Sequence, residues 1–212
     1  MRKLILKMST SLDGFVGGPD GELEWLFRHD DPQAIAWTVD AISQVGVHIM
    51  GSRTFRDMAA YWPTSTEPFA PPMNQIPKVV FSRRGLPGAG SSQSTTRALQ
   101  DARAQAPRPR DDGGAALESW TAARVASGDL ADEIARLKQE PGKDILAHGG
   151  ASFAASLIAH GLVDEFRLLT HPVVLGRGLP IFSKLAKPLA LQLVDVKPFP
   201  GGTVGRIYRP DA

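Results

Sequence analysis

Hydrophobic residues along this chain fall into two alternating patterns. Four short apolar runs, residues 4–8, 47–50, 79–81 and 145–147, have the length and composition of buried strands. Between them, apolar residues recur every three or four positions, as in Ile35, Val39 and Ile42 after Pro32, which is typical of a helix with one buried face. Strands that alternate with helices predict an α/β fold around a mostly parallel sheet.

The C-terminal part of the chain predicts a different kind of strand pairing. Residues 189–196 and 203–208 are two further strand candidates, and Pro200, Gly201 and Gly202 between them have the composition of a hairpin turn. We therefore expect an antiparallel hairpin at one edge of the sheet. By contrast, residues 63–77 contain five prolines and are predicted to connect elements without a regular helix.

Residues 85–117 interrupt the pattern. They mix Gly, Ser, Ala, Pro and charged residues with almost no large apolar ones, which is typical of a flexible surface segment. Within them, residues 97–106 could form a short helix. The chain has 212 residues, of which 42% are hydrophobic and 22% charged. It is therefore expected to form one domain, residues 1–212, with a surface insertion at about 85–117.

Composition narrows the classes of partner. The formal net charge is +2 and basic residues are interspersed with acidic ones, so we expect no nucleic-acid partner. The chain has no cysteine for a disulfide or a thiolate zinc site. Its five histidines lack metal-ligand spacing, so no metal is expected. There is neither a signal-peptide pattern nor an apolar stretch approaching the ~20 residues that span a membrane. A cytoplasmic protein without a membrane partner is therefore expected.

Three polar turns directly follow predicted strands. The first contains Gly51, Ser52, Arg53 and Thr54, the second Ser82, Arg83 and Arg84, and the third Gly149, Gly150, Ala151, Ser152 and Phe153. Helix-start N–H groups, hydroxyls and guanidinium groups bind phosphate oxygens, although any one such turn alone is more often an ordinary turn or a solvated strand end. Because the carboxyl ends of parallel strands share one edge of a sheet, the three turns together predict a cleft for a ligand with several phosphates.

Five segments of the chain, taken in order, match a known family. They read STSLDGFV at 9–16, MGSRTF at 50–55, KVVFSR at 78–83, HGGA at 148–151, and LVDE at 162–165 continuing through PVVLG at 172–176. The chain resembles the dihydrofolate reductase-like family. The branch that it resembles most is the reductase domain of bifunctional riboflavin-biosynthesis enzymes and its stand-alone relatives. This resemblance implies a three-layer fold with a mainly parallel central sheet that binds NADPH.

The resemblance also assigns roles to the turns. It implies that Val16 and Gly17 lie beside the nicotinamide, that residues 51–54 hold the pyrophosphate, and that residues 149–153 contact the cofactor, with a cis peptide bond between Gly149 and Gly150. Ser82 and Arg83, with Arg53 nearby, would flank the 2′-phosphate. Several cations near one phosphate position favour NADPH over NADH, since a 2′-phosphate needs charge-assisted partners.

The resemblance also suggests candidates for the proton donor and for residues that contact the substrate. Asp13 and Asp30 are the candidate catalytic acids, and Asp31 beside Asp30 is an alternative. A helix cap at Asp30 or Asp31, and a turn at Asp13, explain these residues equally well. On the substrate side we expect Trp25 and Thr170, although a β-branched threonine in a strand needs no such role.

The predicted function is an NADPH-dependent reductase of a small heteroaromatic substrate, pterin-like or pyrimidine-like. SLDG at 11–14 and PVVLGRG at 172–178 are similar to the riboflavin branch rather than to true folate reductases. The deaminase part of the bifunctional enzymes would need zinc-binding cysteines, which this chain lacks. The alternative is a non-catalytic or regulatory NADP(H)-binding protein. A third interpretation is an interaction module in which the insertion and an exposed sheet edge form an oligomer interface. The branch also suggests a homodimer.

Overall fold

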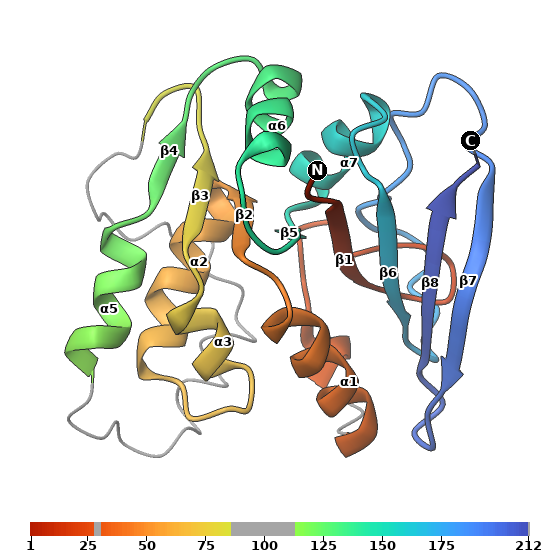
Figure 1. Ribbon diagram of the computed structural model, residues 1–212. Helices are drawn as coiled ribbons and strands as arrows, with labels where there is room; N and C mark the ends of the chain where they lie inside the picture. Colours follow the sequence, from red (N-terminus) through yellow and green to blue (C-terminus); the bar gives the residue numbers. More distant parts are fainter. Residues whose placement is uncertain (28–30, 86–112, 212) are drawn as a thin grey trace.

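The computed structural model describes residues 1–27, 31–85 and 113–211. Its centre is an eight-stranded sheet in the order β4-β3-β2-β5-β1-β6-β8-β7 (Figure 1). The strands are β1 Leu4–Thr10, β2 Val47–Gly51, β3 Lys78–Phe81, β4 Arg124–Ala126, β5 Ile145–His148, β6 Glu165–Thr170, β7 Leu191–Pro198 and β8 Val204–Pro210. Asp30 and the possible helix at 97–106 lie outside the described residues.

Strand direction reverses twice, both times at the C-terminal edge of the sheet. Every neighbouring pair from β4 to β6 is parallel, whereas β6–β8 and β8–β7 are antiparallel. The Phe199 N–H donates to the Thr203 carbonyl across 2.9 Å, and the Gly202 N–H donates to the Phe199 carbonyl, which closes the turn between β7 and β8. The predicted α/β class, the mostly parallel sheet and the C-terminal antiparallel hairpin are all confirmed.

Helices cover both faces of the sheet and give three layers. The elements on one face are α1 Pro32–Ser43, α2 Ser52–Tyr61, α3 Ala70–Gln75 and α5 Gly113–Thr121, and those on the other are α6 Leu130–Gln139 and α7 Ala151–Ala159. Side chains of β1 divide between the two layers, because successive strand residues point to opposite faces. Ile5 packs with Phe55 and Trp120 on the α1 side, whereas Leu4 and Leu6 pack with residues of α6 and α7.

Three details differ from the sequence-based expectations. Helix α3 lies inside the proline-rich connection, because Pro71 and Pro72 occupy its first turn, where a missing N–H costs nothing. Strand β4 was not predicted, and its Arg124 and Val125 are exposed at the sheet edge. Helix α5 begins at Gly113 and buries Trp120, so a regular helix lies inside the last part of the predicted 85–117 insertion.

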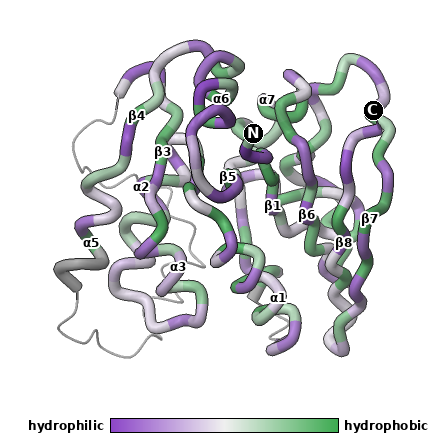
Figure 2. Tube along the Cα trace, viewed as in Figure 1, coloured by the Kyte–Doolittle hydropathy of each residue, from purple (hydrophilic) through white to green (hydrophobic). Residues whose placement is uncertain are grey.

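The β7 edge of the sheet is open to solvent. Strand β7 is exposed along almost its whole length, and Figure 2 shows hydrophobic positions along it. Leu193, Val194 and Val196 are between 44% and 51% exposed. Apolar side chains on an uncovered edge strand favour pairing with another chain. None of the helices among the described residues is long and apolar enough to cross a membrane.

Candidate functional site

The three predicted turns meet at one edge of the sheet. They follow β3, β2 and β5, which are adjacent and parallel. The Thr54 hydroxyl donates to the Gly149 carbonyl across 3.3 Å, and the rings of Phe81 and Phe153 lie 5.1 Å apart. The first turn therefore contacts the third, and the end of β3 packs against the start of α7.

Gly150 is required at this junction for a steric reason. Its φ is +89°, and a Cβ added there would lie 2.7 Å from the Thr54 hydroxyl oxygen. Either feature disfavours any other residue. The cis peptide bond implied by the resemblance is wrong for this structure, because the described residues contain no cis peptide bond. The positive φ of Gly150 makes the sharp turn with trans bonds instead.

Two helices begin at these turns without a side-chain cap. Gly51 precedes α2 and Gly150 precedes α7, and neither offers a capping side chain. The first N–H groups of each helix therefore keep their capacity to bind an anion. Ser52 stands in the first turn of α2 and Ala151 in that of α7. This arrangement fits the pyrophosphate of a dinucleotide.

Three arginine side chains belong to the turns at this edge of the sheet. Arg53, Arg83 and Arg84 are exposed, and none of the ion pairs within the described residues uses them. The Ser82 hydroxyl donates to the Gly85 carbonyl across 2.6 Å, which closes the turn after β3. These guanidinium groups are thus available to a phosphate.

The loop after β1 is fastened to the segment that follows β6. The Val16 N–H donates to the Leu179 carbonyl, and the Leu179 N–H donates to the Gly17 carbonyl, both at 2.9 Å. A Cβ added at Gly178 would lie 2.3 Å from the Gly17 oxygen, so the two backbones approach as closely as glycine allows. Val16 is buried, 8% exposed, and packs in the core.

Asp13 strengthens the same connection. Its carboxylate accepts the N–H groups of Leu175 at 3.2 Å and Gly176 at 2.8 Å. Hydrogen bonding, first from Ser11 and then from these backbone groups, lowers the pKa of Asp13. A carboxylate held as an acceptor is suited to fix a turn, which is the alternative raised by the sequence. The assignment of Asp13 as a catalytic acid stays a prediction.

Asp31 caps α1. Its carboxylate accepts the N–H groups of Gln33 at 2.9 Å and Ala34 at 3.3 Å, and also the Gly201 N–H at 2.6 Å. The bond from Gly201 is the main cause that lowers the pKa of Asp31. The cap interpretation is therefore confirmed for Asp31, which also ties α1 to the β7–β8 hairpin.

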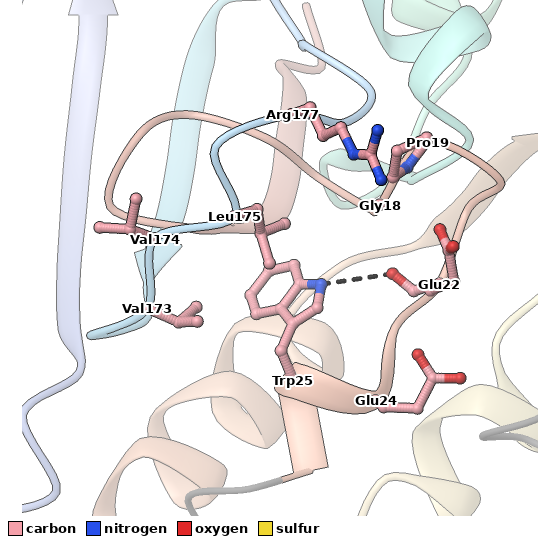
Figure 3. A pocket seen from close by; sticks show the side chains of 9 residues that line it. All are labelled: Gly18, Pro19, Glu22, Glu24, Trp25, Val173, Val174, Leu175 and Arg177. Atoms are coloured by element: carbon pink, nitrogen blue, oxygen red, sulfur yellow. Dashed lines mark hydrogen bonds between the residues drawn. The ribbon is translucent and has the colours of Figure 1, made fainter.

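A hollow of about 350 Å³ lies between the loop after β1 and the segment after β6 (Figure 3). Its lining consists of Gly18, Pro19, Glu22, Glu24, Trp25, Val173, Val174, Leu175 and Arg177. The Trp25 indole N–H donates to the Glu22 carbonyl across 3.3 Å, and its ring lies edge-on to His171 at 5.3 Å. Figure 3 shows the Trp25 ring beside Leu175. Of the two predicted substrate contacts, Trp25 lines this hollow.

Thr170 does not line the hollow. It is buried, and its hydroxyl shares a hydrogen bond of 3.2 Å with that of Thr10. The pair joins the ends of β1 and β6, where the two strands are in register. A direct ligand contact of Thr170 stays a prediction.

A row of basic side chains inside the sheet was missed from the sequence. Lys7 is in register with His148, and His48 with Lys78. The rings of His48 and His148 lie 4.4 Å apart. Burial lowers the pKa of Lys7 to about 8 and that of His48 to about 3, and it also lowers the pKa of His148. The available signal was a lysine or histidine inside or directly beside each apolar strand run: Lys7, His48, Lys78 and His148.

Comparisons with known proteins agree with this architecture. Residues 2–204 match the RibD C-terminal domain family. The protein YyaP of Bacillus subtilis is 30% identical over 207 residues, which cover 98% of this chain and 94% of that one.

Two solved structures show the same fold. A putative riboflavin biosynthesis protein from Shewanella superposes with a TM-score of 0.69 at 20% identity, over the whole of both chains. Dihydrofolate reductase from Enterococcus faecalis, complexed with NADP(H), superposes with a TM-score of 0.57 at 13% identity, over 99% of this chain and 97% of that one. The dihydrofolate reductase-like fold predicted above is confirmed, and the chain belongs to the RibD C-terminal domain family.

Proposed function

We propose that this protein is an NADPH-dependent reductase that transfers hydride to a small heteroaromatic substrate with a pterin-like or pyrimidine-like ring. Family and fold support a reductase-type role. The observation that carries the proposal is the placement of two features on one sheet edge. The phosphate-binding turns follow β3, β2 and β5, and the hollow lies beyond β1 and β6, the next two strands.

The cofactor would extend along this edge. Its pyrophosphate would bind the uncapped starts of α2 and α7, and its 2′-phosphate would bind Arg83 with Ser82 and Arg84 after β3. The nicotinamide would then point toward β1 and would lie beside Val16 and Gly17 in the loop that follows this strand. When bound, NADPH would supply the hydride.

The hollow would hold the substrate ring. Trp25 offers an aromatic surface, Val173 and Leu175 offer apolar walls, and Glu22 and Arg177 offer polar groups at its rim. Small-ligand sites commonly combine apolar walls with a few polar groups. Fixing the ring against the nicotinamide and keeping water away would be the main contribution of these residues.

The experiment that tests the proposal is a titration of intrinsic tryptophan fluorescence with NADPH and with NADH. We expect NADPH to bind at micromolar concentrations and more tightly than NADH. A panel of dihydropterins and aminopyrimidines would then be screened by the loss of NADPH absorbance. No binding of either NADPH or NADP⁺ would refute the proposal. Binding without turnover of any compound would favour the non-catalytic alternative.

We further propose that the protein forms a homodimer through the open edge at β7. The support is the exposed apolar row of Leu193, Val194 and Val196, which would lose contact with water in such a pair.

A further inference from the structure

Three charged side chains line the hollow between the loop after β1 and the segment after β6. Glu22 and Glu24 belong to the first wall and Arg177 to the second. The Glu22 carboxylate is already engaged, because it accepts the Asp20 N–H across 2.9 Å and lies against Gly18. Within the part of the chain that the structure describes, the side chains of Glu24 and Arg177 form no ion pair or hydrogen bond. A carboxylate and a guanidinium group are therefore available to a ligand in the hollow.

These two charges approach the hollow from different directions. In the view of Figure 3, Arg177 lies above the Trp25 ring and Glu24 lies below it. Glu24 directly precedes Trp25 at the start of the short 3₁₀ helix η1, Glu24–Phe27, and Trp25 is 5% exposed. A planar ligand that packs against an aromatic side chain keeps its polar groups at its own edges. A ring held at Trp25 would thus meet the guanidinium group on one edge and the carboxylate on another.

The backbone around Arg177 is held in place on both sides. The Gly176 N–H donates to the Asp13 carboxylate across 2.8 Å, and the Leu179 N–H donates to the Gly17 carbonyl across 2.9 Å. Binding loses less affinity to conformational entropy when the segments that contact the ligand are ordered beforehand. The position of Arg177 is therefore suited to recognition of a specific group on a ligand.

The chemistry of the two side chains differs in one decisive respect. A guanidinium group only donates hydrogen bonds, and an ionised carboxylate only accepts them. The ring edge at Arg177 must therefore carry an acceptor, such as an oxo group, and the edge at Glu24 must carry a donor, such as an amino group. A site that hydrogen-bonds a ligand group rejects an analogue that leaves the site's polar group unpaired.

We propose that Arg177 and Glu24 select rings that carry both an oxo and an amino group, an inference that rests on the proposed function. Arg177 donates to the oxo oxygen, Glu24 accepts from the amino group, and Trp25 packs against the ring. The same ring with two oxo groups would place an oxygen against the Glu24 carboxylate. The ring with two amino groups would place N–H groups against the Arg177 guanidinium.

The test uses three pteridines of nearly equal shape: pterin with one amino and one oxo group, lumazine with two oxo groups, and 2,4-diaminopteridine. Isothermal titration calorimetry on the full chain with NADP⁺ present would measure each Kd. We expect the wild type to bind pterin most tightly. Arg177→Gln should raise the Kd for pterin and lumazine roughly tenfold to a hundredfold and leave that for 2,4-diaminopteridine unchanged. Glu24→Gln should weaken pterin and 2,4-diaminopteridine by a similar factor and spare lumazine.

Two control variants remove a charge at exposed positions outside the hollow. Lys187→Gln and Glu118→Gln should bind all three pteridines as the wild type does. The crossed pattern separates recognition from a structural role, because damage to the hollow would weaken all three ligands alike. Such a uniform loss, equal affinity of the wild type for the three pteridines, or no binding of any of them would overturn the inference. Failure of NADP⁺ itself to bind, titrated beforehand, would instead refute the proposed function.

Discussion

The Thr54 hydroxyl donates a hydrogen bond of 3.3 Å to the Gly149 carbonyl, although 95 residues separate the two. This contact fixes the start of α2 against the end of β5. It leaves only enough room for glycine at position 150, where a Cβ would meet the same hydroxyl. The proposed cofactor edge is therefore a packed junction of two helix starts.

Replacing Gly150 by alanine should disrupt this junction. We expect a free energy of unfolding lower by about 1–3 kcal/mol, because an L-residue at positive φ is strained. Urea unfolding would measure it, and fluorescence titration should show weaker NADPH binding. The matched control is Gly161→Ala, since Gly161 also has a positive φ, +63°, but faces open space. Equal NADPH affinity in the two variants would mean that the contact with Thr54 has no part in binding.

Replacing Arg83 by alanine should discriminate between the two nicotinamide cofactors. A hydrogen bond to a charged group contributes about 1.5–3 kcal/mol, so the Kd for NADPH should rise roughly tenfold to a hundredfold. The Kd for NADH, which has no 2′-phosphate, should stay nearly constant. Lys187→Ala, which removes a positive charge from another exposed position, controls for the change in net charge. An unchanged preference for NADPH would show that Arg83 does not contact the 2′-phosphate.

The cap formed by Asp31 predicts a dependence of stability on acid pH. The folded state lowers the pKa of this carboxyl. The stabilisation is therefore fully present above its unfolded value, and it is lost as pH falls through the lower folded value. Asp31→Ala should melt at a lower temperature at neutral pH. Asp31→Asn can still cap the helix and should lose part of the acid dependence. Thermal melts between about pH 2 and pH 7 would show whether the difference between wild type and Asp31→Asn narrows in acid.

Substitution of the open edge should change the state of association. In the proposed dimer, Val196→Lys would place a charge on the paired edge of β7, and we expect it to shift the protein toward monomer. Sedimentation velocity over a range of concentrations would measure this. Leu117→Lys places the same charge at an exposed position of α5 and should leave association unchanged. A wild type that sediments as a monomer at every concentration would refute the dimer.

The strands and the polar turns that follow them were predictable because both follow from local patterns. Buried parallel strands appear as short apolar runs, and polar residues directly after them must gather at one edge. Strand β4 escaped detection because two of its three residues are exposed, which leaves no apolar run. Helix α3 escaped detection because a proline-rich segment indicates a connection, whereas the prolines of α3 lie in its first turn, where they are harmless.

The parts of the site that could not be predicted depend on contacts across the fold. Asp13 reads as a turn residue, yet its bonds go to Leu175 and Gly176 in a distant segment. Likewise His48 and His148, 100 residues apart, meet only because β2 and β5 are neighbours.

The fastening of the loop after β1 to the segment after β6 has a consequence for ligand exchange. Leu12, Asp13, Val16 and Gly17 all bond to backbone groups between Val173 and Leu179, and both segments line the hollow. Neither wall can swing outward by itself without breaking several of these bonds. Entry and departure of a molecule would therefore require the two segments to move as one flap. A mutation that loosens either segment should alter residence time before it alters the chemical step.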